Sequence, residues 1–285
     1  MFRSDQLGLC CGSLVQADFR GLAEAASAAG FTSISVWPTL FYGALDSGLS
    51  EADLRTILND NGLRVTELDP LMSWLPLELD DSDMAAGFLS YSEDHFYRIA
   101  DELGARSLNF IQQGDSPISE SERIDLISGI CERGKAHQLQ VSVEFLPWSP
   151  IGNLQTALDL VAVVAKDNFG VNIDIWHHFR SGGTIEQLVK VDAARVNALQ
   201  FNDVAAKAWD NVVEETSMGR LLPGEGSSNS AAVLRALEKA GVDAPLNVEV
   251  FSAGLMALPA IEAANMLFTS TQRVIENAGD SQCAM

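Results

Sequence analysis

The stretch VNIDIWHHFRSGG, from Val171 to Gly183, decides how the rest of this chain is interpreted. Its first six residues alternate in a pattern that predicts a β-strand, and two histidines, an arginine and a glycine pair follow directly. Burying an unpaired carboxylate is costly, so Asp174 inside this strand needs a partner, either a metal ion or a buried cation. A metal or a catalytic cation would make the strand end a functional site, whereas a purely structural ion pair is the alternative.

Strand and helix patterns alternate on both sides of this stretch. Eight strands are predicted, at Leu7–Gly12, Phe31–Trp37, Leu63–Leu71, Ser107–Gln113, Gln140–Leu146, Val171–Trp176, Val196–Asp203 and Pro245–Phe251. Eight helices are predicted between and after them, at Asp18–Ala29, Ser50–Asn61, Asp94–Leu103, Ser119–His137, Leu154–Asp167, Thr184–Lys190, Asn229–Ala240 and Leu258–Asn277.

This alternation implies parallel strands joined by right-handed crossovers. Eight strand–helix units in about 250 residues is the size of a TIM barrel. A doubly wound open sheet is the alternative, but the turn GLCCGS after the first strand lacks the GxGxxG pattern of a dinucleotide fold. We therefore predict an α/β fold, a single (β/α)8 TIM-barrel domain over residues 1–285.

The composition excludes several classes of partner. The net charge is −21, from 18 basic and 39 acidic residues, and such a surface repels nucleic acid. No apolar run reaches the ~18–20 residues of a membrane span, and the N-terminus lacks a signal-peptide layout. We expect a soluble, cytoplasmic protein without a membrane partner.

The four cysteines form no CxxC pair, and adjacent Cys10 and Cys11 are expected to be reduced core residues rather than reactive thiols.

Four polar residues stand out inside otherwise apolar strands five to eight. They are Glu144, Asp174, Gln200 and Glu249. Neighbouring strands lie ~4.8 Å apart, so we expect the four side chains to lie in register and converge in the barrel mouth. Three carboxylates and one amide oxygen suit a hard divalent ion such as Mg²⁺ or Mn²⁺ better than a soft-ligand zinc site. Four separate buried polar residues with local partners are the alternative.

These strands also carry a resemblance to a known family. The matching stretches are VEFLPW with Glu144, NIDIWHHFRSGG with Asp174 and His177, LQFNDV with Gln200, RLLPGEG, and NVEVFS with Glu249. The chain resembles the xylose isomerase-like TIM-barrel superfamily, in its sugar phosphate isomerase/epimerase branch, most strongly over residues 141–252. The resemblance implies one divalent metal, Mn²⁺, Mg²⁺ or Co²⁺, at the four positions above. It also implies that Glu144 and Glu249 shuttle protons and that His177 contacts the substrate.

One position departs from the common family pattern. Many members have a histidine where this chain has Gln200, and a glutamine carbonyl is a weaker metal ligand than an imidazole. Glutamine also occurs at this position in some members, including bacterial 3-dehydroshikimate dehydratases. Glutamine at position 200 therefore favours a lyase over an epimerase, but it does not decide between the two activities.

The expected activity is that of a divalent-metal-dependent isomerase or epimerase. It would act on a small, sugar-like, polyhydroxylated keto substrate through a metal-stabilised enediolate, with Glu144 and Glu249 as acid and base. A metal-dependent dehydratase of the 3-dehydroshikimate or keto-inositol type is the alternative, with His177 or His178 as the acid. A non-catalytic ligand-binding barrel is an alternative of another class. An endonuclease IV-like nuclease is disfavoured, because it needs three metals and this chain has only four histidines.

Further residues are candidate substrate contacts. They are His178, Arg180, Arg220, Trp37, Glu67 and Asn109. Arg180 and Arg220 would clamp an anion or a hydroxyl group, with a surface position as the equal alternative for Arg220. Trp37 and Trp148 would form apolar walls, with core or rim packing as the equal alternative for each. If the strand continues past residue 176, His177 and His178 point in opposite directions. Residues 72–93 are either a lid or a solvated insertion. Members of the family that this chain resembles are often dimers or tetramers, so a homo-oligomer is possible, although the sequence shows no interface.

Overall fold

The computed structural model describes residues 2–77 and 84–280, and its centre is a closed barrel of eight parallel strands in sequential order. The strands are β1 (Leu7–Leu9), β2 (Ser33–Val36), β3 (Arg64–Leu71), β4 (Ser107–Phe110), β5 (Gln140–Glu144), β6 (Phe169–Asp174), β7 (Val196–Phe201) and β8 (Leu246–Val248). β1 pairs with β8, which closes the barrel. The predicted (β/α)8 fold is confirmed.

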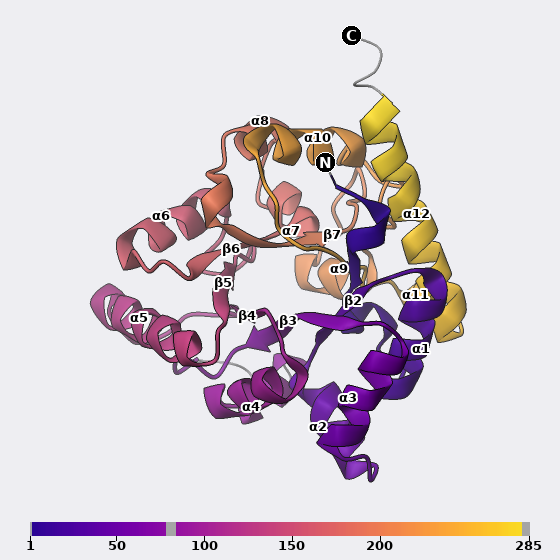
Figure 1. Ribbon diagram of the computed structural model, residues 1–285. Coiled ribbons are helices and arrows are strands. Elements are labelled where there is room, and N and C mark those ends of the chain that lie inside the picture. The colour runs from indigo at the N-terminus through magenta and orange to yellow at the C-terminus, as the bar shows by residue number, and fades with distance from the viewer. Residues whose placement is uncertain (1, 78–83, 281–285) are drawn as a thin grey trace.

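Helices surround the barrel, as Figure 1 shows. The α-helices are α1 (Phe19–Ala29), α2 (Pro38–Asp46), α3 (Glu51–Asp60), α4 (Glu93–Leu103), α5 (Glu120–Ala136), α6 (Leu154–Val164), α7 (Ile175–Arg180), α8 (Ile185–Val189), α9 (Val212–Met218), α10 (Ser230–Ala240), α11 (Ala253–Met256) and α12 (Ala260–Asp280). α1 and α12 pack side by side, so the first and last large helices complete the ring. No helix of the described residues is both long and apolar enough to span a membrane.

The helix α7 is the most important difference from the predicted elements. β6 ends at Asp174, and the residues that follow turn into helix instead of continuing the strand. The Asp174 side chain causes this change, because its Oδ1 accepts a hydrogen bond from the His177 backbone N–H at 2.9 Å and caps the helix. His177 and His178 therefore do not sit on opposite faces of a strand.

Besides the four-residue α11 (Ala253–Met256), two other helices fall where no helix was predicted. α2 begins at Pro38, directly after the predicted strand Phe31–Trp37, and proline is well suited to the first position of a helix. α9 lies between the predicted strand Val196–Asp203 and the predicted helix Asn229–Ala240, and it is capped by the Asn211 side chain. β1 is also shorter than predicted, and Cys11 begins a short 3₁₀ turn, Cys11–Leu14.

The core fills the space between the barrel and its helices. Large side chains such as Phe19, Phe96 and Phe169 are almost completely buried there. Cys10 and Cys11 are buried free thiols, and burial raises the pKa of both well above the usual value. Their placement agrees with the prediction of core residues, while Cys283 lies outside the described residues.

Candidate active site

A pocket of about 430 Å³ opens at the carboxyl end of the barrel strands, the end at which TIM-barrel enzymes carry their catalytic groups. Its charged and imidazole lining comes from five residues, Asp69, Glu144, His177, Arg220 and Glu249. Aromatic side chains supply much of the remaining wall, namely Trp37, Phe88, Trp148 and Phe251. The pocket therefore combines apolar walls with a floor of ionisable groups.

The four residues predicted as metal ligands occupy successive strands but not one register. Gln200 pairs with Asp174, whereas Glu144 pairs with Asn172, two residues earlier on β6. Gln200 in turn pairs with Asn247, two residues before Glu249. The expectation of four residues in register is thus corrected, because barrel strands tilt and their register is staggered.

The two glutamates of this set are each held by a neighbouring amide. Asn109 Nδ2 donates to Glu144 Oε2 at 2.7 Å, and Gln200 Nε2 donates to Glu249 Oε1 at 3.1 Å. Both glutamates are almost completely buried. Each carboxylate is therefore fixed in orientation and still has a second oxygen that faces other groups of the site.

Arg220 connects the carboxylates of β6 and β8. Its Nη1 lies 2.6 Å from Asp174 Oδ2 and 2.8 Å from Glu249 Oε2. Nε donates to the Thr216 carbonyl, and Nη2 donates to Thr216 Oγ1 and lies 3.3 Å from His177 Nε2. All five guanidinium N–H groups thus have partners within the protein.

His177 lies between this guanidinium and the second glutamate. Its Nε2 is 3.3 Å from Arg220 Nη2 and also 3.3 Å from Glu144 Oε1. A lone pair on Nε2 would accept from Arg220, whereas a proton there would be donated to Glu144. His177 Nδ1 is buried without a partner in the described part of the chain. The presence or absence of a proton on Nε2 therefore determines whether His177 donates a hydrogen bond to Glu144 or accepts one from Arg220.

Burial and charge shift the pKa values of these carboxyls in opposite directions. Burial raises the pKa of Glu249 well above its usual value, despite the opposing effect of Arg220. Burial also acts to raise the pKa of Asp174, but Arg220 and His177 outweigh it and the pKa is lowered. Burial, reinforced by Glu144, raises the pKa of Asp69 to about 7. Asp174 thus favours its ionised form, whereas Glu249 and Asp69 keep their protons to a higher pH than ordinary carboxyl groups.

The residues at this site fit a divalent cation. Glu144, Asp174 and His177 each offer a ligand atom, and these atoms lie within 4.8 Å of one another. Gln200 Oε1 is buried and has no hydrogen-bond partner among the described residues, so it is free to accept from a ligand or to bind a cation. Three converging carboxylates and an unpaired amide oxygen are a donor set that hard divalent ions prefer.

The candidate substrate contacts divide into two groups. Trp37 and Arg220 line the pocket, whereas Asn109 lies behind Glu144 and orients it. Glu67 lies deeper in the barrel, where it accepts hydrogen bonds from Asn172 and from Asn247. It is thus bound by the interior of the barrel and is not among the residues that line the pocket.

His178 and Arg180 face away from the pocket. His178 Nε2 lies 3.0 Å from the Thr184 carbonyl, and burial lowers the pKa of this histidine. Arg180 forms an ion pair with the buried Glu215 and donates to the Ala205 carbonyl. The structure therefore does not bring these two residues together with the other candidates, because α7 turns them outward.

The sequence analysis left Asp69 out of the predicted site. Its carboxylate lies at the carboxyl end of β3, lines the pocket, and accepts a hydrogen bond from Trp37 Nε1 at 3.3 Å. The signal was present, because Glu67 and Asp69 share one face of the strand and Asp69 lies nearer its carboxyl end. Met72 and Phe88, from the segment proposed as a lid, also line the pocket, while residues 78–83 of that segment lie outside the described residues.

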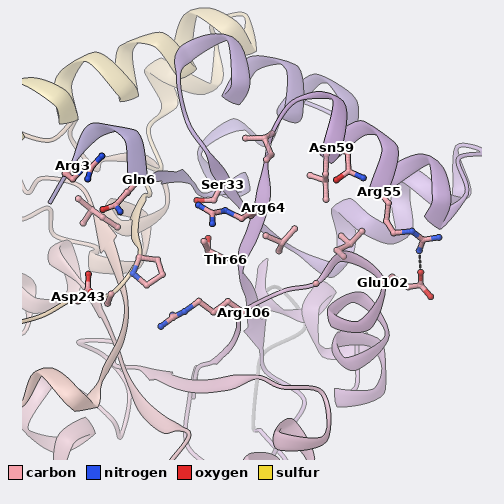
Figure 2. Close-up of a pocket in the computed structure, with 18 of the residues that line it drawn as sticks. Arg3, Gln6, Ser33, Arg55, Asn59, Arg64, Thr66, Glu102, Arg106 and Asp243 are labelled. Atoms are coloured by element: carbon pink, nitrogen blue, oxygen red, sulfur yellow. Dashed lines mark hydrogen bonds and ion pairs between the residues drawn. The ribbon is translucent and has the colours of Figure 1, made fainter.

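A larger cavity, of about 720 Å³, lies at the opposite, amino-terminal end of the barrel. Figure 2 shows Arg64 and Arg106 pointing into it, with Arg55 paired to Glu102 at its edge. Arg106 donates to the Asn197 carbonyl at 2.8 Å. This end of a TIM barrel usually serves stability, and the cavity brings together no pair of carboxylates comparable to Glu144 and Glu249. Its size alone does not make it the active site.

Residues 23–270 match the family model described as xylose isomerase-like TIM barrel, and the chain belongs to this family. The resemblance inferred from the sequence is confirmed. Among curated relatives, inosose isomerase of Halalkalibacterium halodurans is 25% identical over 154 residues, which are 53% of this chain and 54% of that protein. The 3-dehydroshikimate dehydratase of Pseudomonas aeruginosa is 25% identical over 241 residues, 83% of this chain and 36% of that protein.

Solved structures share the fold. A crystal structure of IolI protein with a zinc atom superposes with a TM-score of 0.82 at 18% identity and covers 96% of this chain and 99% of its own. The probable 3-dehydroshikimate dehydratase AsbF of Bacillus anthracis gives a TM-score of 0.73 at 19% identity, with 95% and 99% covered. The chain spans only about half the length of the first curated relatives that it matches.

Proposed function

We propose that this chain is a divalent-metal-dependent isomerase or epimerase that acts on a sugar-like hydroxy-ketone. One observation carries this proposal: two buried glutamates, Glu144 and Glu249, line one pocket, and each is fixed by an amide neighbour. Isomerisation and epimerisation need one group to remove a proton next to a carbonyl and a group to return it. Two oriented carboxyls in a pocket of water-excluding aromatic walls match that need.

Glu144, Asp174, Gln200 and Glu249 would hold the metal. The close approach of Glu144 and Asp174 ligand atoms and the unpaired Oε1 of Gln200 support this assignment, and His177 offers a further ligand atom within the same 4.8 Å group. When bound, the ion would polarise the substrate carbonyl and stabilise the negative charge that develops on its oxygen. The nature of the ion is left open by this donor set, which suits Mn²⁺ or Mg²⁺, while the IolI structure contains zinc.

The protein's own residues would carry the proton transfers. Glu249 holds its proton more readily than an ordinary glutamate, because burial raises its pKa, so it suits the role of acid at neutral pH. Glu144, fixed by Asn109, suits the role of base. His177 lies next to Glu144 and would bind a substrate hydroxyl through its unpaired Nδ1. Arg220 would keep Asp174 and Glu249 oriented.

A dehydratase is the second candidate. It is favoured by the match of the Pseudomonas aeruginosa 3-dehydroshikimate dehydratase over 83% of this chain and by glutamine at position 200. In that reaction Glu144 or Glu249 would remove the proton, and His177 would protonate the departing hydroxyl group. A non-catalytic barrel would not need two oriented glutamates.

Proton exchange in D₂O separates these candidates. The Mn²⁺-loaded protein is incubated with keto-inositol, common ketohexoses and 3-dehydroshikimate, and the products are followed by NMR. Deuterium next to the carbonyl without loss of water supports an isomerase or epimerase, and a new alkene resonance supports a dehydratase. Absence of exchange with every compound, together with absence of bound metal, would leave a binding protein.

A further inference from the structure

We propose that the substrate is an uncharged polyhydroxylated ketone and that Asp69 is the residue that selects it, by accepting a hydrogen bond from a substrate hydroxyl group. This inference rests on the proposed function, because it concerns the ligand of the same pocket. It depends on two independent features of the site. One is an unpaired, buried carboxylate oxygen in the wall, and the other is the lack of any available cation.

The first feature is the geometry of Asp69. The residue is only 4% exposed, and it lies at the carboxyl end of β3 in the pocket wall. Trp37 Nε1 donates to its Oδ2 at 3.3 Å and fixes the carboxylate, and hydrogen bonding by Trp37 and Ser35 acts to lower the pKa of Asp69 against the effect of burial. Oδ1 makes no hydrogen bond among the described residues. Buried polar oxygens almost always have a donor. A hydroxyl group of a bound ligand is the donor that this position lacks.

The second feature is the state of Arg220. It is the only lysine or arginine among the described residues that line the pocket. Its five N–H groups are already used by Asp174, Glu249, Thr216 and His177. A substrate carboxylate or phosphate would have to break these bonds to be recognised.

The charge balance leads to the same conclusion. Among the described residues that line the pocket, the carboxyl groups of Asp69, Glu144 and Glu249 face one basic side chain, that of Arg220. A carboxylate or phosphate on the substrate would meet an unfavourable potential in this low-dielectric space, whereas an uncharged polyol would not.

The walls fit the same kind of ligand. Trp37 packs edge-to-face against Phe88 and against Phe251, with centroids 5.1 and 6.1 Å apart. Such faces bind the C–H surfaces of a sugar or cyclitol ring. Trp148 Nε1 is buried without a partner in the described part of the chain and would donate to a ring hydroxyl. Of the substrates named for the relatives, this favours a keto-cyclitol over the acid 3-dehydroshikimate.

The test compares ligands that differ only in charge. Binding of D-fructose and D-fructose 6-phosphate, and of methyl shikimate and shikimate, is measured by calorimetry with the Mn²⁺-loaded wild-type protein. The neutral member of each pair is expected to bind at least tenfold more tightly. Tighter binding of the charged members, or no binding of either neutral compound at millimolar concentration, overturns the inference.

The variant Asp69→Asn supplies the residue-level test. It is expected to weaken binding of D-fructose about tenfold and to strengthen binding of the 6-phosphate, because it removes the negative charge that Asp69 carries when ionised. A purely structural role would weaken both alike. Asp60→Asn, which removes one exposed carboxylate at the end of α3, is the matched control and should change neither affinity. If the Asp69 variant is unstable, the wild-type comparison still decides the matter.

The outcome for this inference is separable from that for the proposed function. Proton exchange with a ketose phosphate or with 3-dehydroshikimate, but not with an uncharged ketone, would retain the metal-dependent enzyme and reject the neutral substrate. Preferential binding of uncharged polyols without any exchange would retain the neutral ligand and reject catalysis.

Discussion

Arg220 Nη1 bridges Asp174 Oδ2 and Glu249 Oε2, at 2.6 and 2.8 Å, so one buried guanidinium joins a carboxylate at the end of β6 with one directly after β8. The side chain is only 2% exposed. The positive charge of Arg220 therefore offsets part of the negative charge of the carboxylates of the site. The site can therefore form before a metal ion binds.

Replacement of Arg220 by methionine should leave two buried carboxylates without their cation. Breaking a buried ion pair in this way costs about 3–5 kcal/mol of unfolding free energy. Urea denaturation in the presence of a chelator measures this loss. Mn²⁺ should restore part of the stability, because it supplies the missing positive charge. Arg220→Lys is the control and should lose less, and equal stability of the methionine variant and wild type would contradict the bridging role.

The stability of the metal-free protein should fall as pH rises from about 4 to about 7, through a contribution from Asp69. Its pKa in the folded protein is raised to about 7, from an ordinary value of 3.8, first by burial and then by Glu144. Between these values the folded state binds the proton that the unfolded state has released. The unfolding free energy therefore decreases with pH, by at most about 1.4 kcal/mol per pH unit for one group.

Urea denaturation between pH 4.5 and 8, in the presence of a chelator, measures this dependence. Other buried carboxyls overlap, so the decisive quantity is the difference between wild type and Asp69→Asn. The variant should have a shallower slope in this range. Parallel curves for the two proteins would show that Asp69 titrates at the same pH in the folded and unfolded states.

Glu144→Gln and Glu249→Gln should each reduce substrate proton exchange by about 10²–10⁴-fold, the usual contribution of a general acid or base. Glutamine keeps the size and the carbonyl oxygen of the side chain but cannot carry the proton. Metal content is measured for each variant, so that loss of the ion is distinguished from loss of proton transfer. Unchanged exchange in both variants would reject the proposed roles.

His177 and His178 form a matched pair for mutagenesis, because they are adjacent on α7 and only His177 lines the pocket. His177→Gln should lower kcat at least tenfold. His178→Gln should leave kcat within about twofold and lower the melting temperature, since it changes the contact with the Thr184 carbonyl. Equal losses of activity in the two variants would show that the orientation of α7 does not matter for function.

The sequence predicted the barrel and the set Glu144, Asp174, Gln200 and Glu249 because each polar residue interrupts an apolar strand. The same reasoning placed His178 and Arg180 among the substrate contacts, although neither residue lines the pocket. The alternation of VNIDIW gives no sign that the Asp174 side chain ends the strand and caps a helix. Capping is a contact between a side chain and a backbone amide three residues later, and strand periodicity does not contain it.

Asp69 and Arg220 show a second limit of the sequence analysis. The pairing of Arg220 with Asp174 and Glu249 joins residues 46 and 29 positions apart, and only the closed barrel brings them together. Asp69 was visible as a polar residue late in β3, but its importance depends on the indole of Trp37, which lies beside it in the folded protein. Long-range polar contacts of this kind have no local sequence signal.

Gln200→His should raise metal affinity, because imidazole is a stronger ligand than an amide oxygen for most first-row divalent ions. Gln200 is buried, pairs in register with Asp174, and has an unpaired Oε1 in the described structure, so position 200 faces the donor set. Titration of the chelator-treated protein with Mn²⁺ and Zn²⁺ should show a gain of about tenfold or more, larger for Zn²⁺. Gln112→His is the control, since Gln112 is also a buried glutamine but its side chain donates to the Gly114 carbonyl rather than to a carboxylate. A variant at position 200 that binds both ions as weakly as the control would place the metal elsewhere than beside Gln200.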